Sequence, residues 1–241
     1  MPTKEGNHNF AEAVYQAYGA DFDRADKMVV HRLGMDTSGL LVMGKNLEAV
    51  RNLNESFRTR SVERTYEALV CGNVKQNAGM ISLPLMRDYE KPPFMRVSTD
   101  MHQSVLVGLE NEDVGKKLME LPKDSLTKYE VVGREELNGQ PVTRLALTSI
   151  SGRTHQLNVH LAAFGHPIVG DTTYGMDGDA LPNGGLTREE QDELVPNPNR
   201  ATVEVQEALS DQKKACVHGK TLKFTHPITR EEMSFSTESP F

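Results

Sequence analysis

The chain has 241 residues, of which 37% are hydrophobic and 25% charged, a balance typical of one globular domain with a sizeable core. It has no apolar run near the roughly 20 residues of a membrane-spanning helix, and its first residues lack the apolar core of a signal peptide. The net charge of −7 argues against a broad, nonspecific grip on polyanions, and two cysteines far apart in sequence indicate a reducing, intracellular setting.

Helices dominate the N-terminal part of the chain. Two segments repeat apolar side chains at helical spacing, and Asn46 is suited to cap the second of them. Between them lie two short runs of strand formers around a polar turn. The predicted elements are, in order, a helix at 9–18, strands at 28–33 and 40–43 around a turn at 36–39, and a helix at 47–59.

Strands dominate the rest. The predicted elements are strands at 64–71, 80–85, 126–132 and 142–149 (the last two joined by a turn at 135–141), a helix at 154–164, and a hairpin of 220–224 and 233–236. Because strands outnumber helices and mostly connect as hairpins, the sequence predicts an α+β fold with a mixed, largely antiparallel β-sheet flanked by short helices.

Residues 176–211 hold nine acidic side chains against two basic ones, which accounts for the whole net charge. Prolines and glycines interrupt the same stretch, so the sequence predicts an acidic surface insertion that is mobile. The remainder balances at 25 basic and 25 acidic residues. The overall acidity therefore does not exclude a basic groove for nucleic acid.

The polar turn after residue 31 is the first candidate site. It contains Arg32, Asp36 and Thr37, followed by Gly39, which permits a positive φ. The same residue types stabilise ordinary turns by capping backbone groups. The segment alone leaves both interpretations open.

The predicted helix at 154–164 begins at a second candidate site. Exposed N–H groups and a positive dipole end at such a helix start suit a phosphate or a carboxylate, and Arg153 could pair with either. Alternatively, Thr154 caps the helix and Arg153 pairs with a structural carboxylate. Both interpretations stay open.

Two histidines of the same segment invite a metal interpretation. His155 and His160 are five residues apart, which does not place them on one helical face, and no nearby cysteine or glutamate completes a ligand set. Asp171 is expected to shape a turn. A metal-dependent hydrolase using these three residues is therefore disfavoured.

Four segments resemble, in the same order, the motifs of the RluA-type pseudouridine synthases. Residues 31–42 (HRLGMDTSGLLV) resemble H-R-L-D-x-x-T-S-G-L-L-V, and residues 64–72 (RTYEALVCG) resemble K-x-Y-x-A-x-V-x-G. Residues 152–175 (GRTHQLNVHLAAFGHPIVGDTTYG) and 218–241 (HGKTLKFTHPITREEMSFSTESPF) resemble the two later motifs. Four ordered matches are specific, and the chain is therefore identified as similar to this family.

This resemblance implies a pseudouridine synthase fold with a central RNA-binding cleft. It implies a single catalytic-type domain over residues 1–241, N-terminally short and without an S4 domain. The implied activity is that of an isomerase, which converts uridine to pseudouridine in structured RNA, rRNA or tRNA, without cofactor or metal. The implied setting is an intracellular monomer away from membranes, cytoplasmic, or organellar if the N-terminus is incomplete.

The resemblance also assigns roles to site residues. Tyr66 would stack on the uracil and assist proton transfer, and Arg153 would pair with the catalytic aspartate and keep it ionised. Arg32 would help fill the gap left by the flipped-out base. The residues implied to bind RNA or the base are His31, Arg32, Asp36, Thr37 and Leu157.

Gly34 occupies the position of the family's catalytic aspartate. Covalent catalysis needs that carboxylate, and Asp36 lies about 6–7 Å away along an extended chain, outside the tolerance of catalytic geometry. Asn158 also stands where the family usually has arginine. Two functional hypotheses follow: an RNA pseudouridine synthase with impaired activity, and a catalytically inactive RNA-binding paralogue.

Overall fold

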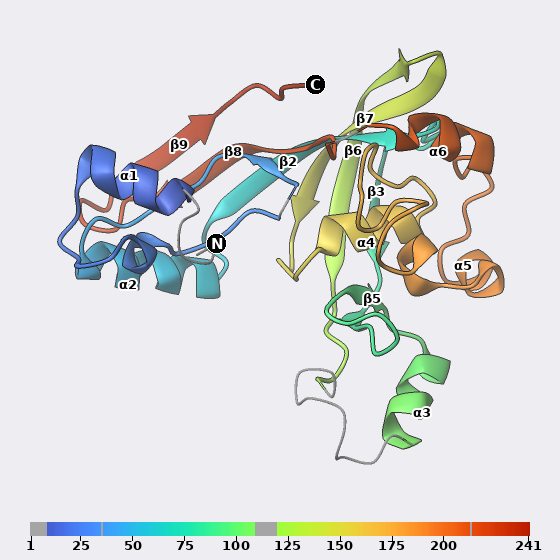
Figure 1. Cartoon of the computed structure of the whole chain (residues 1–241), viewed down its shortest axis with the longest axis horizontal. Coiled ribbons are helices and arrows are strands. Elements are labelled where there is room, and N and C mark those ends of the chain that lie inside the picture. Colours follow the sequence, from blue (N-terminus) through green and yellow to red (C-terminus); the bar gives the residue numbers. More distant parts are fainter. Residues whose placement is uncertain (1–8, 35, 109–119, 213) are drawn as a thin grey trace. The chain divides into compact units, whose positions relative to one another are not determined.

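The computed structural model describes residues 9–34, 36–108, 120–212 and 214–241 (Figure 1). Its helices are α1 (Phe10–Tyr18), η1 (Ala25–Met28), α2 (Leu47–Arg58), α3 (Asp100–Gly108), α4 (Gln156–Ala163), η2 (Pro182–Gly185), α5 (Arg188–Leu194) and α6 (Val203–Ser210). Its strands are β1 (Ser38–Gly39), β2 (Glu63–Cys71), β3 (Ala78–Ser82), β4 (Leu85–Arg87), β5 (Met95–Val97), β6 (Leu126–Leu137), β7 (Gln140–Ser149), β8 (Val217–Thr225) and β9 (Glu232–Ser236). None of the helices in these ranges is both long and apolar enough to cross a membrane.

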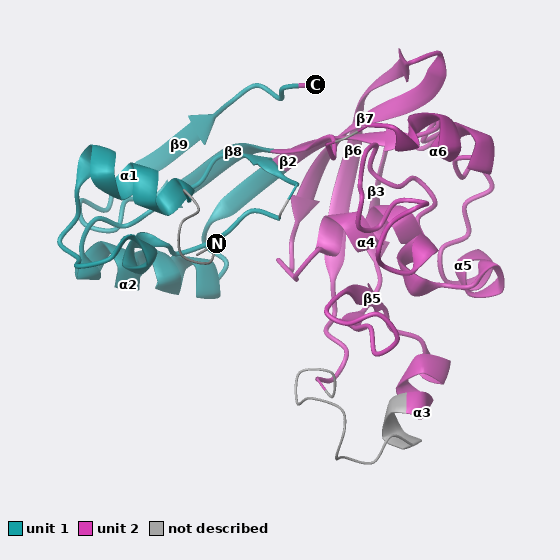
Figure 2. Cartoon of the chain, in the orientation of Figure 1, with its two compact units in different colours: residues 1–65, 219–240 teal, residues 66–218, 241 magenta. Residues whose placement is uncertain are grey.

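The chain divides into two compact units (Figure 2). Unit 1 comprises residues 1–65 and 219–240, and unit 2 comprises residues 66–218 and 241. The strands β2 and β8 each begin in one unit and end in the other. The prediction of a single catalytic domain stays a prediction.

The buried cluster of unit 1 lies between α2 and the C-terminal part of β8, residues 219–225. Leu53 of α2 shares a buried cluster with Leu222 and Phe224 of β8. Asn46 caps α2 by accepting a hydrogen bond from the Ala49 N–H at 2.9 Å, as predicted. The antiparallel pairing of β8 with β9 confirms the predicted hairpin at 220–236.

Two strands predicted in unit 1 are wrong. The predicted strands at 28–33 and 40–43 do not form; only an isolated antiparallel bridge joins Val29 to Met43. The reason is that a side chain, His31, accepts the hydrogen bond of the Val42 N–H that a strand partner would otherwise accept. The helix α1 forms as predicted, but none of its residues is buried.

Unit 2 contains a four-stranded run in the order β2–β7–β6–β3, with β3–β6 and β6–β7 pairing antiparallel. The helix α4 joins these strands in one buried cluster, through residues that include Leu161 with Leu145 and Leu147. Seven of the eight α4 residues are buried, which explains why it lacks a polar face. The predicted mixed α+β fold with a mostly antiparallel sheet is confirmed.

The β6–β7 hairpin is longer than predicted. Its turn consists of Asn138 and Gly139, both with positive φ, rather than the polar stretch 135–141. Asn-Gly is the preferred two-residue hairpin turn, so the strands can extend to its edges. The predicted strand at 80–85 is instead split between β3 and β4.

The acidic segment 176–211 is not the mobile loop that its composition predicts. It contains η2, α5 and α6, and its residue Gln191 is 1% exposed and donates a hydrogen bond to the Ala163 carbonyl at 2.8 Å. Leu209 of α6 is also buried. The segment therefore packs onto the core through a few side chains, while most of its acidic side chains are exposed.

Candidate active site

The predicted site residues fall into two groups, one in each unit. His31, Arg32, Gly34, Asp36 and Thr37 belong to unit 1, and Tyr66, Arg153 and Leu157 belong to unit 2. The RNA-binding cleft itself stays a prediction.

Three hydrogen bonds shape the loop at 31–42. The Thr37 N–H donates to the Gly34 carbonyl at 3.1 Å and closes a tight turn, and the Leu40 N–H donates to the Gly219 carbonyl at 3.0 Å. The Val42 N–H donates to His31 Nε2, also at 3.0 Å. These contacts hold Arg32 and Asp36 at the exposed surface of the loop, with Thr37 half-buried.

His31 supports this loop from inside. Its ring stacks on Phe57 with centroids 4.5 Å apart, and the guanidinium of Arg64 lies 5.5 Å from the same phenyl centroid. Burial, followed by the charge of Arg64, lowers the pKa of His31 to about 4. The imidazole is therefore neutral at pH 7, and its Nε2 is the acceptor that Val42 needs.

Gly34 has room and a backbone conformation for a side chain. Its φ lies outside the positive range that restricts other residues, and a Cβ built on it would meet only Thr37 closely, with Oγ1 at 2.8 Å. A rotation of the Thr37 side chain would relieve this contact. The loop is therefore compatible with an aspartate at this position.

In unit 2, Tyr66 and Leu157 meet at the same core cluster. Leu157, on the first turn of α4, is 8% exposed, and the half-buried Tyr66, on β2, packs against the cluster that contains it. Within the described ranges the Tyr66 hydroxyl makes no hydrogen bond. The aromatic face is anchored by packing while the hydroxyl keeps its hydrogen-bonding capacity.

Arg153 precedes α4. Its backbone N–H donates to Gln156 Oε1 at 2.9 Å, and its guanidinium Nε donates to the Asp124 carbonyl at 3.3 Å. No carboxylate of the described residues lies within 4.0 Å of this guanidinium. The predicted alternative of a structural ion pair for Arg153 is thus not realised within the part of the chain that the structure covers.

Gln156 is a residue that the sequence motif contains but whose role was not predicted. Its buried side chain accepts from Ser151 Oγ and donates from Nε2 to the Leu126 carbonyl and Thr127 Oγ1, at 2.7, 2.9 and 2.9 Å. It therefore ties the turn that carries Arg153 to the start of β6. A glutamine just after the predicted helix start, in a segment rich in apolar residues, was the signal for such a role.

The helix α4 starts at Gln156, two residues later than predicted, because His155 has left-handed backbone angles (φ 51°). His155 Nδ1 lies 2.7 Å from the hydroxyl of Tyr174, which also accepts a hydrogen bond from the Met95 N–H. The hydroxyl and His155 Nδ1 therefore share a hydrogen bond, and this contact fixes the residue next to Thr154 and Arg153.

The candidate metal-binding residues are engaged with protein partners. His160 uses Nδ1 with Thr127 Oγ1 and Nε2 with the Leu83 carbonyl, at 2.9 and 3.0 Å. Asp171 accepts two backbone N–H groups and the side chain of Asn158, which supports its predicted turn role. Among the described residues, no group of three His, Cys, Asp or Glu could hold a metal ion.

Comparisons with known proteins agree with one another. The model of the RNA pseudouridylate synthase family matches residues 2–163. The dual-specificity RNA pseudouridine synthase RluA of Pasteurella multocida (strain Pm70) is 34% identical over 211 residues, which are 88% of this chain and 73% of that protein. The ribosomal large subunit pseudouridine synthase D of Vibrio cholerae serotype O1 is 34% identical over 212 residues, 88% of this chain and 52% of that protein.

A solved structure shows the same similarity. Human RNA pseudouridylate synthase domain containing 1 superposes with a TM-score of 0.61 at 26% identity, covering 88% of this chain and 69% of the human chain.

Proposed function

Because this chain belongs to the RNA pseudouridylate synthase family, we propose that it recognises a uridine in structured RNA and that its conversion of uridine to pseudouridine is impaired at Gly34. One observation carries the proposal: Arg153 presents a guanidinium that no carboxylate of the described residues neutralises. In the resemblance that the sequence motifs establish, the partner of this arginine is the aspartate that Gly34 replaces.

The reaction implied by the family assigns a task to each residue of the proposed site. A carboxylate attacks the flipped-out nucleotide, the uracil detaches and rotates, and a C–C glycosidic bond replaces the C–N bond. Tyr66 would stack on the uracil, Leu157 would wall its pocket, and Arg32 would fill the space that the base leaves in the RNA. These roles need no metal and no cofactor.

The missing carboxylate affects the chemistry more than the binding. Stacking on Tyr66 and contacts of the loop at 31–42 with RNA do not use a side chain at position 34. Asp36 stands two residues further along, in the turn that the Thr37 N–H closes on the Gly34 carbonyl, and catalytic geometry tolerates only small displacements of the attacking carboxylate. We therefore expect uridine recognition with little or no turnover.

The substrate class follows from the relatives. One relative is a dual-specificity RNA pseudouridine synthase, and another is a pseudouridine synthase of the ribosomal large subunit. We propose ribosomal RNA as the substrate, with tRNA as the second candidate, and an intracellular monomer as the acting form.

Binding and turnover of the unaltered chain test this proposal together. The probe is a synthetic RNA stem-loop with uridines in the loop, and the matched control is the same stem with cytidines in the loop. We expect tighter binding of the uridine loop and, after long incubation, pseudouridine at or near background. Equal binding of both loops, or no binding, would contradict the proposed recognition.

A second candidate function is RNA binding without any catalysis, which the same absence of a carboxylate favours. Slow pseudouridine formation that disappears in the variant Asp36→Ala would exclude it and would assign residual catalysis to Asp36. No formation in either form would favour it.

A further inference from the structure

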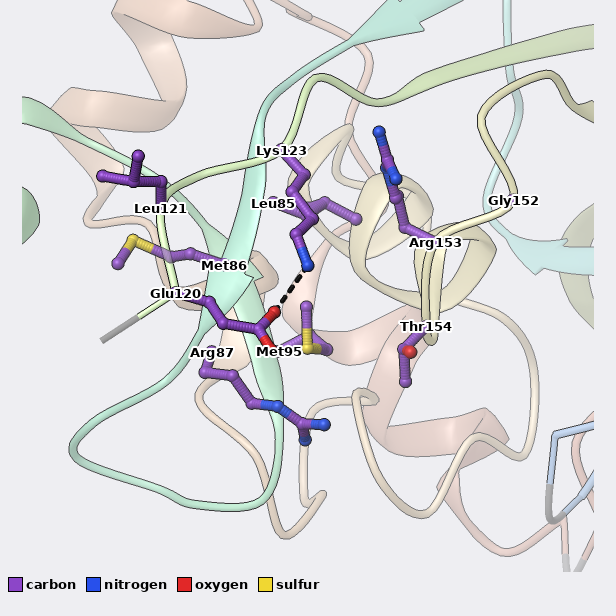
Figure 3. Close-up of a pocket in the computed structure, with 10 residues that line it drawn as sticks. All are labelled: Leu85, Met86, Arg87, Met95, Glu120, Leu121, Lys123, Gly152, Arg153 and Thr154. Atoms are coloured by element: carbon purple, nitrogen blue, oxygen red, sulfur yellow. Dashed lines mark hydrogen bonds and ion pairs between the residues drawn. The ribbon is translucent and has the colours of Figure 1, made fainter. Parts of the chain in front are cut away.

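A pocket of about 210 Å³ opens beside Arg153 in unit 2 (Figure 3). Pockets that hold drug-sized ligands usually measure about 300–1,000 Å³, so this one suits a single group of a larger molecule. Its lining comprises three cations, one carboxylate and mostly apolar remaining residues: Arg87, Lys123 and Arg153; Glu120; and Leu85, Met86, Met95, Leu121, Gly152 and Thr154.

Hydrogen bonds to backbone groups hold each of the three cationic residues. Lys123 exchanges two hydrogen bonds with Leu85, its N–H donating to the Leu85 carbonyl at 2.8 Å and its carbonyl accepting at 2.9 Å. The guanidinium of Arg87 donates to the Pro93 carbonyl at 2.6 Å, and that of Arg153 to the Asp124 carbonyl at 3.3 Å. These contacts fix the guanidinium groups of Arg87 and Arg153 and the backbone of Lys123.

The charges form a row rather than a cluster. Figure 3 shows Lys123 between Arg153 and Arg87, with its ammonium directed toward Glu120. The Lys123 Nζ–Glu120 Oε2 distance is 2.5 Å, and both side chains are 49% exposed. Of the described carboxylates, none forms an ion pair with Arg87 or Arg153. Within the described part of the chain, a ligand would therefore meet two cations without an ion-pair partner and a third, Lys123, that pairs with an exchangeable carboxylate.

We propose that this pocket, which we call the Arg87–Lys123–Arg153 pocket, binds a backbone phosphate of the RNA strand that flanks the target uridine, and that the phosphate displaces Glu120 from Lys123. The proposal rests on the proposed function for the identity of the polyanion. A row of cations that starts at Arg153 suits a strand that leaves the reaction site, because phosphate contacts fix the register of a nucleic acid. The apolar side chains of Met86 and Met95 supply a water-poor wall, next to which charge pairing is stronger.

Salt-dependent RNA binding of paired variants tests this assignment. The probe is the uridine stem-loop, titrated by fluorescence anisotropy at several KCl concentrations. Lys123→Ala should weaken binding and reduce the slope of log Kd against log [KCl] by about 0.7–0.9, the loss of one phosphate contact. Glu120→Gln should tighten binding, because the neutral amide no longer competes for Lys123.

The matched controls come from another exposed ion pair of unit 2. Lys128 Nζ lies 2.7 Å from Glu130 Oε1, with side-chain exposures of 51% and 57%. Lys128→Ala and Glu130→Gln make the same charge changes outside the pocket, so they should leave the salt slope unchanged. Thermal melts check that every variant is folded, and if Lys123→Ala does not fold, Glu120→Gln decides alone.

The outcomes separate the two proposals. If the unaltered chain binds the stem-loop but Lys123→Ala or Glu120→Gln behaves like its control, the pocket assignment is wrong and the proposed function stands. If the unaltered chain does not bind the stem-loop, both are wrong.

Discussion

The two glycines of the loop at 31–42 differ in whether a side chain could replace their hydrogen. Gly34 has an ordinary φ, and only the Thr37 hydroxyl lies close to the place that a Cβ would take. Gly39 has φ +126°, and a Cβ there would lie 2.4–2.7 Å from backbone atoms of Gly219. Only Gly39 is therefore required by the backbone, and the glycine at position 34 has no such structural reason.

We predict that Gly39→Ala lowers the free energy of unfolding by at least about 1–3 kcal/mol, the cost of a strained backbone. Gly34→Ala should change it by no more than about 0.5 kcal/mol, as at an unconstrained surface position. Urea unfolding of both variants measures the difference. Equal losses would contradict this description of the loop.

Buried neutral histidines make the stability depend on pH. Burial lowers the pKa of both His31 and His160 to about 4, whereas an unfolded histidine titrates near 6.5. Between these values the unfolded chain binds protons that the folded chain does not. The free energy of unfolding is therefore highest above pH 6.5 and falls as the pH drops toward 4.

We predict a fall of up to about 1.4 kcal/mol per pH unit for each such histidine between pH 6.5 and 5, before most carboxylates titrate. Urea unfolding at both pH values measures it, and His160→Gln should flatten the slope. An unchanged free energy of unfolding across this window would contradict the neutral assignment of these rings.

At the scale of elements, the entry into α4 depends on a bond between two side chains. The Tyr174 hydroxyl accepts a hydrogen bond from the Met95 N–H and shares another with Nδ1 of His155, whose left-handed backbone precedes the helix. Removing the hydroxyl removes both hydrogen bonds.

We predict that Tyr174→Phe lowers the free energy of unfolding by about 1–3 kcal/mol, the cost of an unsatisfied buried polar group. Tyr18→Phe is the control, because Tyr18 is 71% exposed. Equal stability of Tyr174→Phe and the unaltered chain would show that the bond does not hold the start of α4.

The elements that could be predicted are those whose signals are local. Asn46 indicates the start of α2, and the strand-forming residues at 64–71 indicate β2. The strands predicted at 28–43 fail because a side chain from elsewhere in the loop, His31, replaces the strand partner. The helices α5 and α6 were missed because their hold on the core depends on few residues, such as Gln191 and Leu209, within an acidic, proline-interrupted stretch.

At the scale of the whole molecule, unit 2 contains a partly buried ion-pair network, in which the side chain of Glu67 is 6% exposed and that of Glu135 39%. Arg144 on β7 lies 2.8 Å from Glu67 of β2 and 2.6 Å from Glu135 of β6, and it donates to the Phe241 carbonyl at 3.0 Å. These bonds raise the pKa of Arg144, hydrogen bonding to Glu135 contributing most. The network joins three strands and the last residue of the chain.

We predict that Arg144→Ala lowers the free energy of unfolding by about 3–5 kcal/mol, because it removes the guanidinium that pairs with the buried Glu67 carboxylate. Arg144→Ala combined with Glu67→Gln should recover part of this loss. Chemical unfolding of the three proteins compares them; a loss below about 1 kcal/mol for Arg144→Ala would contradict the role of the network.

The family could be predicted more securely than the single elements, because four motifs in order specify a family whatever the local structure, and the roles of the site residues stay predictions. Arg153 and Leu157 were placed correctly at the start of a helix. Lys123 and Arg87 carried no motif: the bridge between Leu85 and Lys123 brings Lys123 to the strand of Arg87, and the bond from Arg153 to the Asp124 carbonyl places Arg153 beside them. Contacts between distant segments of this kind leave no pattern in a single sequence.

We propose that this chain keeps a uridine-recognition site and lacks the catalytic carboxylate. The most direct test is pseudouridine formation in the uridine stem-loop by the variant Gly34→Asp, with the isosteric Gly34→Asn as control and the unaltered chain alongside. We predict that Gly34→Asp forms pseudouridine and that Gly34→Asn forms none above background. Equal formation by all three proteins, or none with a folded, RNA-binding Gly34→Asp, would contradict it.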